Sequence, residues 1–294
     1  MTEPVEVLHF TDPGCPWAYS AEPFLTALRW RYATGLAWRR VMIGLTESTA
    51  QYDARGYKPE RSARGRIRYR RFGMPYAFGV RPRNMATGRA CRAVKAAELQ
   101  GDQLAEAYLR WLRFGFFTTT LLMDTDDALV ELAHRVDGLD PDRLARDLTS
   151  DAVESAYQRD WAETRNAAQT GRPAIAQTKT ANTDGDERFT APSLVFRRGG
   201  AALVAGGWQT LEAYDVLIAN LAPDLPRRPP ATPAEIVAAS PHGVTTFEAA
   251  VACTAPNDAV DRDAVLAALI TLAFEGAARR VELGDDALWL PTGS

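Results

Sequence analysis

Cys15 is the residue with the clearest potential for covalent chemistry. It follows the turn-forming Asp12-Pro13-Gly14 sequence and precedes Pro16, which suits the first turn of a helix. A cysteine at a helix N-terminus lies beside unpaired backbone N–H groups and the positive end of the helix dipole, so its pKa is expected to fall below about 8.5. Because the thiolate is the nucleophilic form of cysteine, the sequence predicts a nucleophile at this position.

No second thiol lies in the same tetrapeptide, because the position three residues after Cys15 is Ala18. A mixed disulfide on Cys15 would therefore need a second thiol from solution, from the substrate or from elsewhere in the chain. Cys91 is the internal candidate, although its apolar surroundings favour a small core residue. Two other interpretations of the tetrapeptide remain open: Cys15 is an inert packing residue, or Ala18 is an engineered replacement that traps a mixed disulfide.

A strand and a helix are expected to position this cysteine. The apolar run at residues 5–10 predicts a buried strand, and apolar residues at helical spacing predict a helix from residue 16 to residue 32. A second strand at 36–43 completes a strand–helix–strand unit of the kind that forms a parallel sheet. Later, a hairpin is expected at 193–205 and a helix at 210–221.

A helical block is expected to interrupt this α/β unit between about residues 53 and 170. Its first part, residues 53–88, is rich in arginine and aromatic residues and shows no clean period. Periodic apolar positions then predict four helices, at residues 90–99, 104–117, 126–136 and 142–168.

These features resemble the thioredoxin superfamily, and within it the DsbA-like and FrnE-like oxidoreductases that carry a helical insertion. The resemblance rests on the first strand, the sequence Cys-Pro-Trp-Ala, Pro23 eight residues after the cysteine and the segment 190–196. It covers about residues 5–222 and implies a thioredoxin-like α/β fold. It also implies that the Ala191-Pro192 peptide bond is cis and lies against the cysteine.

The resemblance further implies thiol–disulfide chemistry with Cys15 as the nucleophile. The substrate would then contact a set of residues close to it in the fold, namely Pro16, Trp17, Ala18, Asn84, Ala191 and Pro192. The expected second reactant is a low-molecular-weight thiol such as glutathione or mycothiol, with no tightly bound cofactor. Two alternatives stay open: a thiol-dependent transferase or isomerase of the kappa or 2-hydroxychromene-2-carboxylate isomerase type, and a non-catalytic binding protein.

The arginine-rich stretch supports a second hypothesis about ligands. Between Arg55 and Arg92 the chain has twelve Lys or Arg residues and only one acidic residue, Glu60. Such a density could attract an anionic thiol or an acidic substrate to a cavity near the sulfur. The alternative is a solvated face that the acidic helices after Asp124 neutralise.

A proline-rich connection at residues 223–233 predicts a domain boundary. Residues 234–294 are expected to form three helices and a hairpin, which is typical of a winged-helix domain. This segment has nine acidic residues from Thr232 to Ser294 against three arginines, so it would repel nucleic-acid phosphates. A docking module or homodimer interface is therefore the favoured interpretation.

Composition excludes several broad classes of protein. The 294 residues are 46% hydrophobic with a formal net charge of −3, which argues against disorder and against a generally basic nucleic-acid binder. The three cysteines are too widely spaced for a zinc site, so no metal is expected. The N-terminus lacks the features of a signal peptide and no apolar run is long enough to span a membrane, so a cytoplasmic location is predicted.

Overall fold

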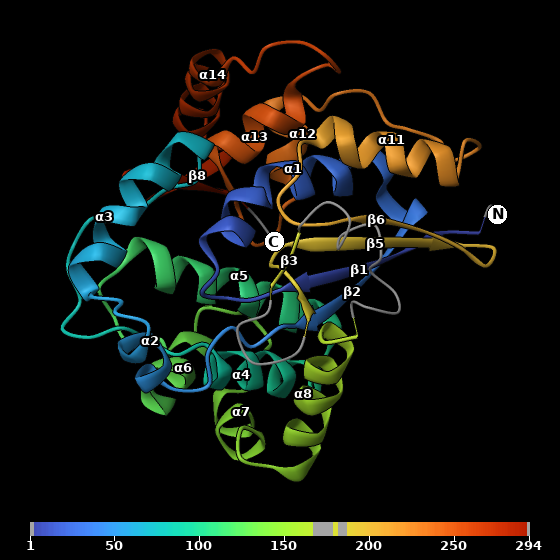
Figure 1. The fold of residues 1–294 in the computed structure, drawn as a ribbon. Coiled ribbons are helices and arrows are strands. Elements are labelled where there is room, and N and C mark those ends of the chain that lie inside the picture. The colour runs from blue at the N-terminus through green and yellow to red at the C-terminus, as the bar shows by residue number, and fades with distance from the viewer. Residues whose placement is uncertain (1–2, 167–178, 182–186, 293–294) are drawn as a thin grey trace.

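A four-stranded sheet lies at the centre of the protein, with helices on both of its faces (Figure 1). The computed structural model describes residues 3–166, 179–181 and 187–292. The strand order is β2-β1-β5-β6, with strands β1 (Val5–Thr11), β2 (Leu36–Met42), β5 (Ser193–Arg198) and β6 (Ala201–Ala205). Strand β1 is parallel to β2 and antiparallel to β5, which confirms the predicted strand–helix–strand start.

The β5–β6 hairpin turns on two glycines, as its sequence predicts. Gly199 and Gly200 have φ angles of 54° and 81°, a left-handed backbone that suits a tight two-residue turn between twisted strands. This turn fixes the register in which Val195 pairs with Val204. A separate short pair, β3 (Thr180–Ala181) and β4 (Arg188–Phe189), precedes the hairpin.

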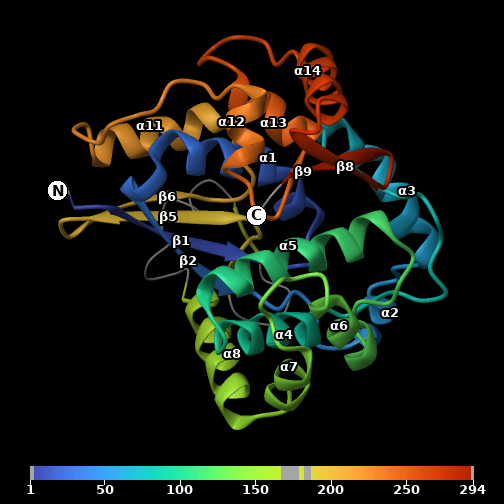
Figure 2. The ribbon, with the colours of Figure 1, turned by 180° about the vertical axis from the view of Figure 1, so that it is seen from behind.

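Helices from different parts of the chain cover the two faces of the sheet. Helices α1 (Pro16–Tyr32) and α11 (Leu211–Leu221) lie on one face, and α4 (Gly88–Glu98) and α8 (Asp151–Thr164) lie on the other (Figure 2). Helix α1 continues through Pro23 and is followed by a single 3-10 turn, η1 (Ala33–Gly35). Helix α5 (Asp102–Thr118) runs beside α4 and reaches α1 through an ion pair between Arg113 and Glu22.

The helical insertion is present, but its first and last parts differ from the prediction. The arginine-rich part contains α2 (Thr49–Ala54), α3 (Pro59–Tyr69) and the 3-10 turn η2 (Arg70–Phe72). Helix α6 (Asp126–Ala133) is followed by two helices where one was expected, α7 (Pro141–Asp147) and α8. The break occurs because the Ser150 side chain accepts a hydrogen bond from the backbone N–H of Val153 and so starts a new helix. The expected end of the insertion near residue 170 lies outside the described residues.

The C-terminal segment contains the predicted three helices and hairpin, with one additional short strand. Its elements are α12 (Pro233–Ala238), β7 (Val244–Thr245), α13 (Thr246–Cys253), α14 (Arg262–Phe274), β8 (Ala278–Leu283) and β9 (Asp286–Pro291). The three strands pair in the order β7-β9-β8. Assignment of this segment to the winged-helix class stays a prediction.

This segment is integrated with the rest of the protein through a shared core. Helix α13 packs on α1, and one hydrophobic cluster contains Leu25 and Leu28 of α1 together with Ile236 and Trp289 of the C-terminal segment. A fully buried Glu248 also pairs with Arg110 of α5. The proline-rich connection therefore joins two parts that share buried surface.

The tip of the last hairpin reaches the chain just after α3. The Asp285 carboxylate accepts a hydrogen bond of 2.8 Å from the backbone N–H of Tyr76 and pairs with Arg70 at 2.7 Å. Gly284 is required beside it, since it has a φ of 58° and a Cβ there would lie 2.8 Å from the Tyr76 carbonyl oxygen.

Candidate functional site

Cys15 is the N-cap residue of α1, at the end of strand β1. Its sulfur lies 3.2 Å from the carbonyl oxygen of Ala191 and donates a hydrogen bond to it. The Ala191-Pro192 peptide bond is cis, as the sequence predicts. Residues from both ends of the thioredoxin-like region therefore meet at this sulfur.

The ionisation of Cys15 differs from the prediction. The residue is 5% exposed and packs among apolar side chains that include Leu8, Phe10 and Phe189. Burial raises the pKa of the thiol to about 12, and the N–H groups of Ala18 and Trp17 offset only part of this increase. The expectation of a depressed pKa is wrong because desolvation outweighs the end of the helix, so the thiol is neutral at neutral pH.

A buried carboxylate organises the turn before Cys15. Asp12 accepts hydrogen bonds of 2.9 Å from the backbone N–H of Gly14, 2.9 Å from that of Leu45 and 2.8 Å from the hydroxyl of Thr87. Burial raises the pKa of Asp12 in spite of these donors. The sequence indicates a backbone turn at this residue. An aspartate two residues before a glycine is also a signal for a turn in which the aspartate side chain accepts the hydrogen bond.

Cys91 contacts this same carboxylate. Its sulfur lies 3.6 Å from Oδ2 of Asp12, and burial raises the pKa of the Cys91 thiol well above its ordinary value. Both Cys15 and Cys91 are free thiols in the structure. A fully buried position in the insertion core agrees with the structural interpretation of Cys91.

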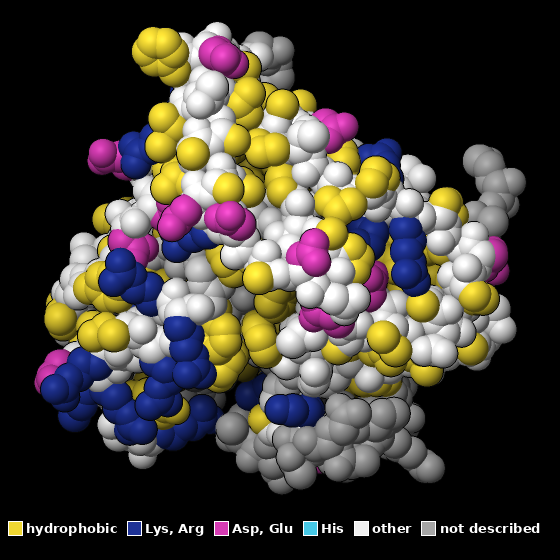
Figure 3. All heavy atoms as spheres, turned by 90° about the horizontal axis from the view of Figure 1, so that it is seen from above, with side chains coloured by type: hydrophobic (Ala, Val, Ile, Leu, Met, Phe, Trp, Pro, Cys, Tyr) yellow, Lys and Arg dark blue, Asp and Glu magenta, His cyan; other side chains and the backbone are white. Residues whose placement is uncertain are grey.

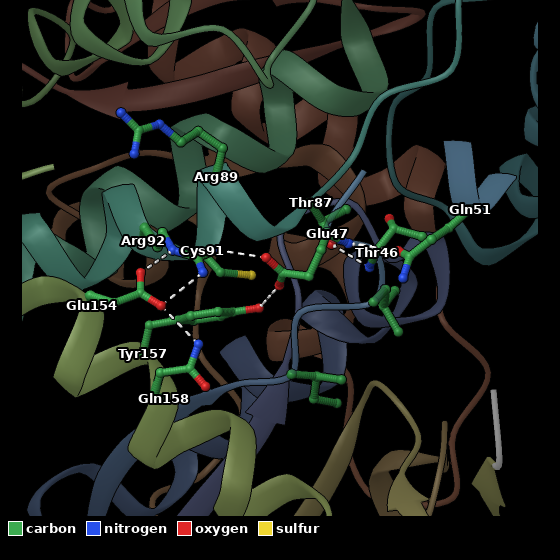
Figure 4. A network of polar contacts seen from close by, with 12 residues as sticks. Thr46, Glu47, Gln51, Thr87, Arg89, Cys91, Arg92, Glu154, Tyr157 and Gln158 are labelled. Carbon is green, nitrogen blue, oxygen red and sulfur yellow. Dashed lines mark hydrogen bonds and ion pairs between the residues drawn. The ribbon is translucent and has the colours of Figure 1, made fainter. Parts of the chain in front are cut away.

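A polar network lies around Cys91 and links α4 to α8 and to the segment after β2 (Figure 4). Glu47 accepts a hydrogen bond from the Tyr157 hydroxyl and pairs with Arg92 at 2.8 Å, and Arg92 pairs with Glu154 at 2.6 Å. The Thr87 hydroxyl and backbone bind the Thr46 backbone, which ties the start of α4 to the segment after β2. These contacts fix the Thr87 hydroxyl that donates to Asp12.

A cavity of about 500 Å³ lies beside the N-terminus of α1 and is lined by Gly14, Pro16 and Asn84 among others. Asn84 donates a hydrogen bond of 3.0 Å to the Tyr57 carbonyl oxygen, which holds its side chain against α3. A Cβ at Gly14 would lie 2.6 Å from the methyl group of Thr87, so only glycine fits this wall. The structure thus brings Pro16 and Asn84 to one cavity, as a shared site requires.

The other two predicted residues of the tetrapeptide lie elsewhere. Trp17 is 36% exposed and contacts Tyr69, Phe72 and Trp208 at ring-centroid distances of 5.1, 5.3 and 6.3 Å. We call this set, together with Phe24 against Trp208, the aromatic cluster. Ala18 is fully buried, so its methyl group is not available to a substrate and only its N–H faces the sulfur.

The arginine-rich stretch contains arginines with carboxylate partners and arginines that line the cavity, and attraction of an anionic ligand by the latter stays a prediction. Several of its arginines are neutralised by ion pairs, namely Arg70 with Asp285, Arg83 with Asp124, Arg89 with Asp126 and Arg92 with Glu154. Others line the cavity, and Figure 3 shows Lys and Arg side chains gathered at the lower left, at the edge that α3 occupies. The acidic helices therefore compensate only the arginines that face them.

Comparison with known proteins agrees with this architecture. A family model described as Thioredoxin matches residues 8–189, which is more than half of the chain. The chain belongs to the thioredoxin family. A probable DsbA oxidoreductase from Streptomyces coelicolor shares this thioredoxin fold with a TM-score of 0.56 and 20% identity, over 75% of this chain and 91% of that one. At that identity the likeness concerns the fold alone.

Curated relatives of this thioredoxin-family chain include proteins named ClpXP adapter protein SpxH. The protein from Shouchella clausii is 30% identical over 158 residues, which is 54% of this chain and 52% of the relative. The one from Bacillus subtilis is 29% identical over 163 residues, 54% of this chain and 53% of the relative. The chain thus spans about half the length of the curated relatives that it matches.

Two further observations concern the described part of the chain only. It contains no cluster of three or more His, Cys, Asp or Glu side chains that could hold a metal ion. None of its helices combines the length and the apolar character that crossing a membrane would need.

Proposed function

We propose that this protein is a non-catalytic binding protein of the thioredoxin family, in which Cys15 packs and positions the turn before α1 and does not turn over. The observation that carries the proposal is the state of the sulfur. It is enclosed by apolar side chains, it donates a hydrogen bond to Ala191, and its pKa of about 12 keeps it protonated. A protonated thiol is not a nucleophile.

The cysteines elsewhere in the chain support this proposal. A disulfide exchange cycle needs a second thiol, and position 18 holds Ala18. Cys91 is fully buried and bonded to Asp12, while Cys253 belongs to α13 in the C-terminal segment. The described structure pairs neither of them with Cys15.

The surface beside Cys15 is suited to binding a polypeptide. The aromatic cluster exposes part of Trp17 next to the N-terminus of α1, and tryptophan and tyrosine often anchor protein interfaces. The relatives named ClpXP adapters are consistent with such a role.

A homodimer through the C-terminal segment stays a prediction, for which Phe274 and Ile270 of α14, 94% and 53% exposed, are the natural contacts. A cytoplasmic location also stays a prediction.

Alkylation of Cys15 across a pH series tests the proposal. The Cys91→Ala/Cys253→Ala variant leaves Cys15 as its one thiol, and its reaction with iodoacetamide gives an apparent pKa. We expect slow labelling with an apparent pKa above about 8.5, the value of a free cysteine. The Trp17→Ala variant in the same background is the control for steric shielding by the aromatic cluster. An apparent pKa well below that value would contradict the proposal.

A second candidate is the single-cysteine exchange that the sequence suggests. It is favoured by the cis Ala191-Pro192 bond at the sulfur, by the two helix N–H groups that face it and by the cavity beside Pro16. In this reaction the Cys15 thiolate attacks the glutathione sulfur of a substrate–glutathione disulfide and releases the substrate thiolate. A second glutathione then attacks the mixed disulfide, which regenerates Cys15 and yields glutathione disulfide.

Mass spectrometry separates the two candidates. After incubation with glutathione disulfide, an adduct on Cys15 that glutathione removes would support exchange. Reversible binding of glutathione without added mass would instead support a transferase or isomerase of the kappa type. We expect no adduct on Cys15, because the sulfur is protonated and enclosed.

A further inference from the structure

The cavity beside α1 has a wall that is rich in cationic side chains. Six arginines line it, namely Arg61, Arg64, Arg66, Arg68, Arg81 and Arg83. No Asp or Glu side chain is found among the described residues that line it. A cavity of about 500 Å³ is within the size range of small-molecule sites, which is roughly 300–1,000 Å³.

The charges of these arginines are compensated to very different degrees. Arg83 pairs closely with Asp124, and its pKa is raised by that carboxylate. Arg64 has only a 3.5 Å contact with an exposed Glu60. Arg61 and Arg68 are exposed and make no ion pair with any Asp or Glu in the described residues.

Arg66 is the most informative member of this set because it is 6% exposed and has no carboxylate partner among the described residues. Its guanidinium donates hydrogen bonds of 2.6 Å to the carbonyl oxygen of Ala77 and 3.5 Å to that of Phe116. Burial lowers its pKa, in contrast to Arg83. A buried cation without a counter-charge is costly, and an anion in the cavity would reduce that cost.

The carbonyl groups at the C-terminal end of α5 hold two of these arginines in place. Arg81 donates to the carbonyl oxygens of Phe116 at 2.6 Å and Thr119 at 2.8 Å, and Arg66 shares Phe116 with it. These contacts fix the guanidinium groups before any ligand arrives. Such preorganisation reduces the entropy that binding must offset.

Tyrosines complete the lining without adding negative charge. Tyr52 and Tyr69 line the cavity, and burial raises the pKa of Tyr52 to about 12 and also raises that of Tyr69. Both phenols are therefore protonated at neutral pH, and a protonated phenol can donate a hydrogen bond to an anion.

We propose that this cavity binds a small molecule that carries two or more oxyanion groups, as phosphates or carboxylates, and that Arg61, Arg66 and Arg68 contact those groups. The planar guanidinium of arginine can form paired hydrogen bonds with two oxygen atoms of either a carboxylate or a phosphate. Arg61, Arg66 and Arg68 line the cavity and have no carboxylate partner among the described residues, which is more positive charge than one carboxylate would neutralise, so the ligand carries more than one oxyanion group. The site does not depend on whether Cys15 reacts, since its sulfur is not among the lining atoms described.

Calorimetric titration of the full chain with pyrophosphate and with citrate tests this proposal, with acetate as a singly charged control. We expect saturable binding of one molecule per chain that weakens as salt is added. Binding of pyrophosphate alone would identify phosphate as the preferred group, and binding of citrate alone would identify carboxylate. Binding of neither compound, or binding no tighter than that of acetate, would overturn the proposal.

Matched variants locate the binding. The Arg61→Gln/Arg68→Gln variant should bind the titrated anion at least about tenfold more weakly, since it loses the charge-assisted hydrogen bonds of two guanidinium groups. The Arg71→Gln variant is the control, because Arg71 is exposed in the same stretch, has no ion pair among the described residues and lies outside the lining. An equal loss in both variants would show nonspecific attraction and contradict the proposal.

Discussion

Two pairs of arginines at helix α5 have different hydrogen-bond partners. Arg110 and Arg113 lie on α5 itself, and each meets a buried carboxylate, Glu248 or Glu22. Arg66 and Arg81 approach the C-terminal end of α5 and meet carbonyl oxygens only. The first pair joins α5 to α1 and α13, whereas the second pair faces a cavity.

This difference indicates which arginines are structural and which are available to a ligand. A buried arginine with a carboxylate partner is already neutralised, and removal of the partner is expensive. An arginine that donates only to neutral carbonyl oxygens is not neutralised, so its positive charge remains available to a ligand in the adjacent cavity. Stability and binding should therefore respond to different members of the arginine-rich set.

The largest expected effect comes from the most buried pair. Glu22→Gln removes the negative charge beside the Arg113 guanidinium, which also donates a hydrogen bond of 2.6 Å to the Thr11 hydroxyl, and should lower the free energy of unfolding by about 3–5 kcal/mol. Urea denaturation measures this change. The double variant Glu22→Leu/Arg113→Met removes both charges and should restore most of the loss. A double variant as unstable as the single one would show that packing, and not charge, sets the effect.

A somewhat smaller effect is expected at the contact with the C-terminal segment. Glu248, the capping-box residue of α13, pairs with Arg110 through two hydrogen bonds of 2.7 Å. Glu248→Gln removes its charge and one of its two acceptor oxygens, so we expect a loss of about 3 kcal/mol. Glu235 holds the same capping position in α12 but is exposed and lacks an arginine. Glu235→Gln should therefore cost much less stability than Glu248→Gln in the same urea experiment. Equal losses of stability in the two variants would show that the ion pair with Arg110 adds nothing to the helix cap.

Lowering the pH should destabilise the protein because it protonates Glu106. This residue extends the comparison to a half-buried ion pair. Burial alone would raise the pKa of Glu106, but Arg29 and Arg40 lower it from 4.5 to about 2. A carboxylate with a lower pKa in the folded state contributes stability above pH 4.5, and this contribution is lost as the pH falls from 4.5 through about 2. The unfolding free energy measured across this range should fall less steeply in Glu106→Gln than in the unmodified protein. Parallel curves would contradict the prediction.

The smallest effect on stability is expected at the cavity. Arg61→Gln and Arg68→Gln remove exposed charges that no described carboxylate neutralises, so each should change the free energy of unfolding by no more than about 0.5 kcal/mol. Thermal and urea unfolding measure this change. A loss of several kcal/mol would show that these arginines stabilise the fold, as Arg110 and Arg113 of α5 do.

Much of the fold follows from local signals in the sequence. Alternating and continuous apolar runs identify β1 and β2, and Gly199-Gly200 identifies the β5–β6 hairpin. The cis bond before Pro192 and an arginine-lined cavity beside the N-terminus of α1 also agree with the sequence. Helix α3 was not predicted because arginines on several of its faces conceal the apolar period.

The sequence alone does not predict the properties of the site that depend on tertiary contacts. The pKa of Cys15 depends on desolvation by Phe189 and other side chains distant in sequence, which the helix signal cannot report. The burial of Asp12 depends on donors from Leu45 and Thr87. Likewise, the sequence does not show that α13, which follows the proline-rich connection, packs on α1.

The hairpin contact at Tyr76 has a consequence for the timing of folding during synthesis. Asp285 binds the backbone of Tyr76 and the side chain of Arg70, which follow directly after α3. The ribosome must therefore extrude about two hundred residues beyond α3 before the helix that carries Arg61, Arg66 and Arg68 gains this anchor. Until then, the segment that follows α3 lacks both of these contacts.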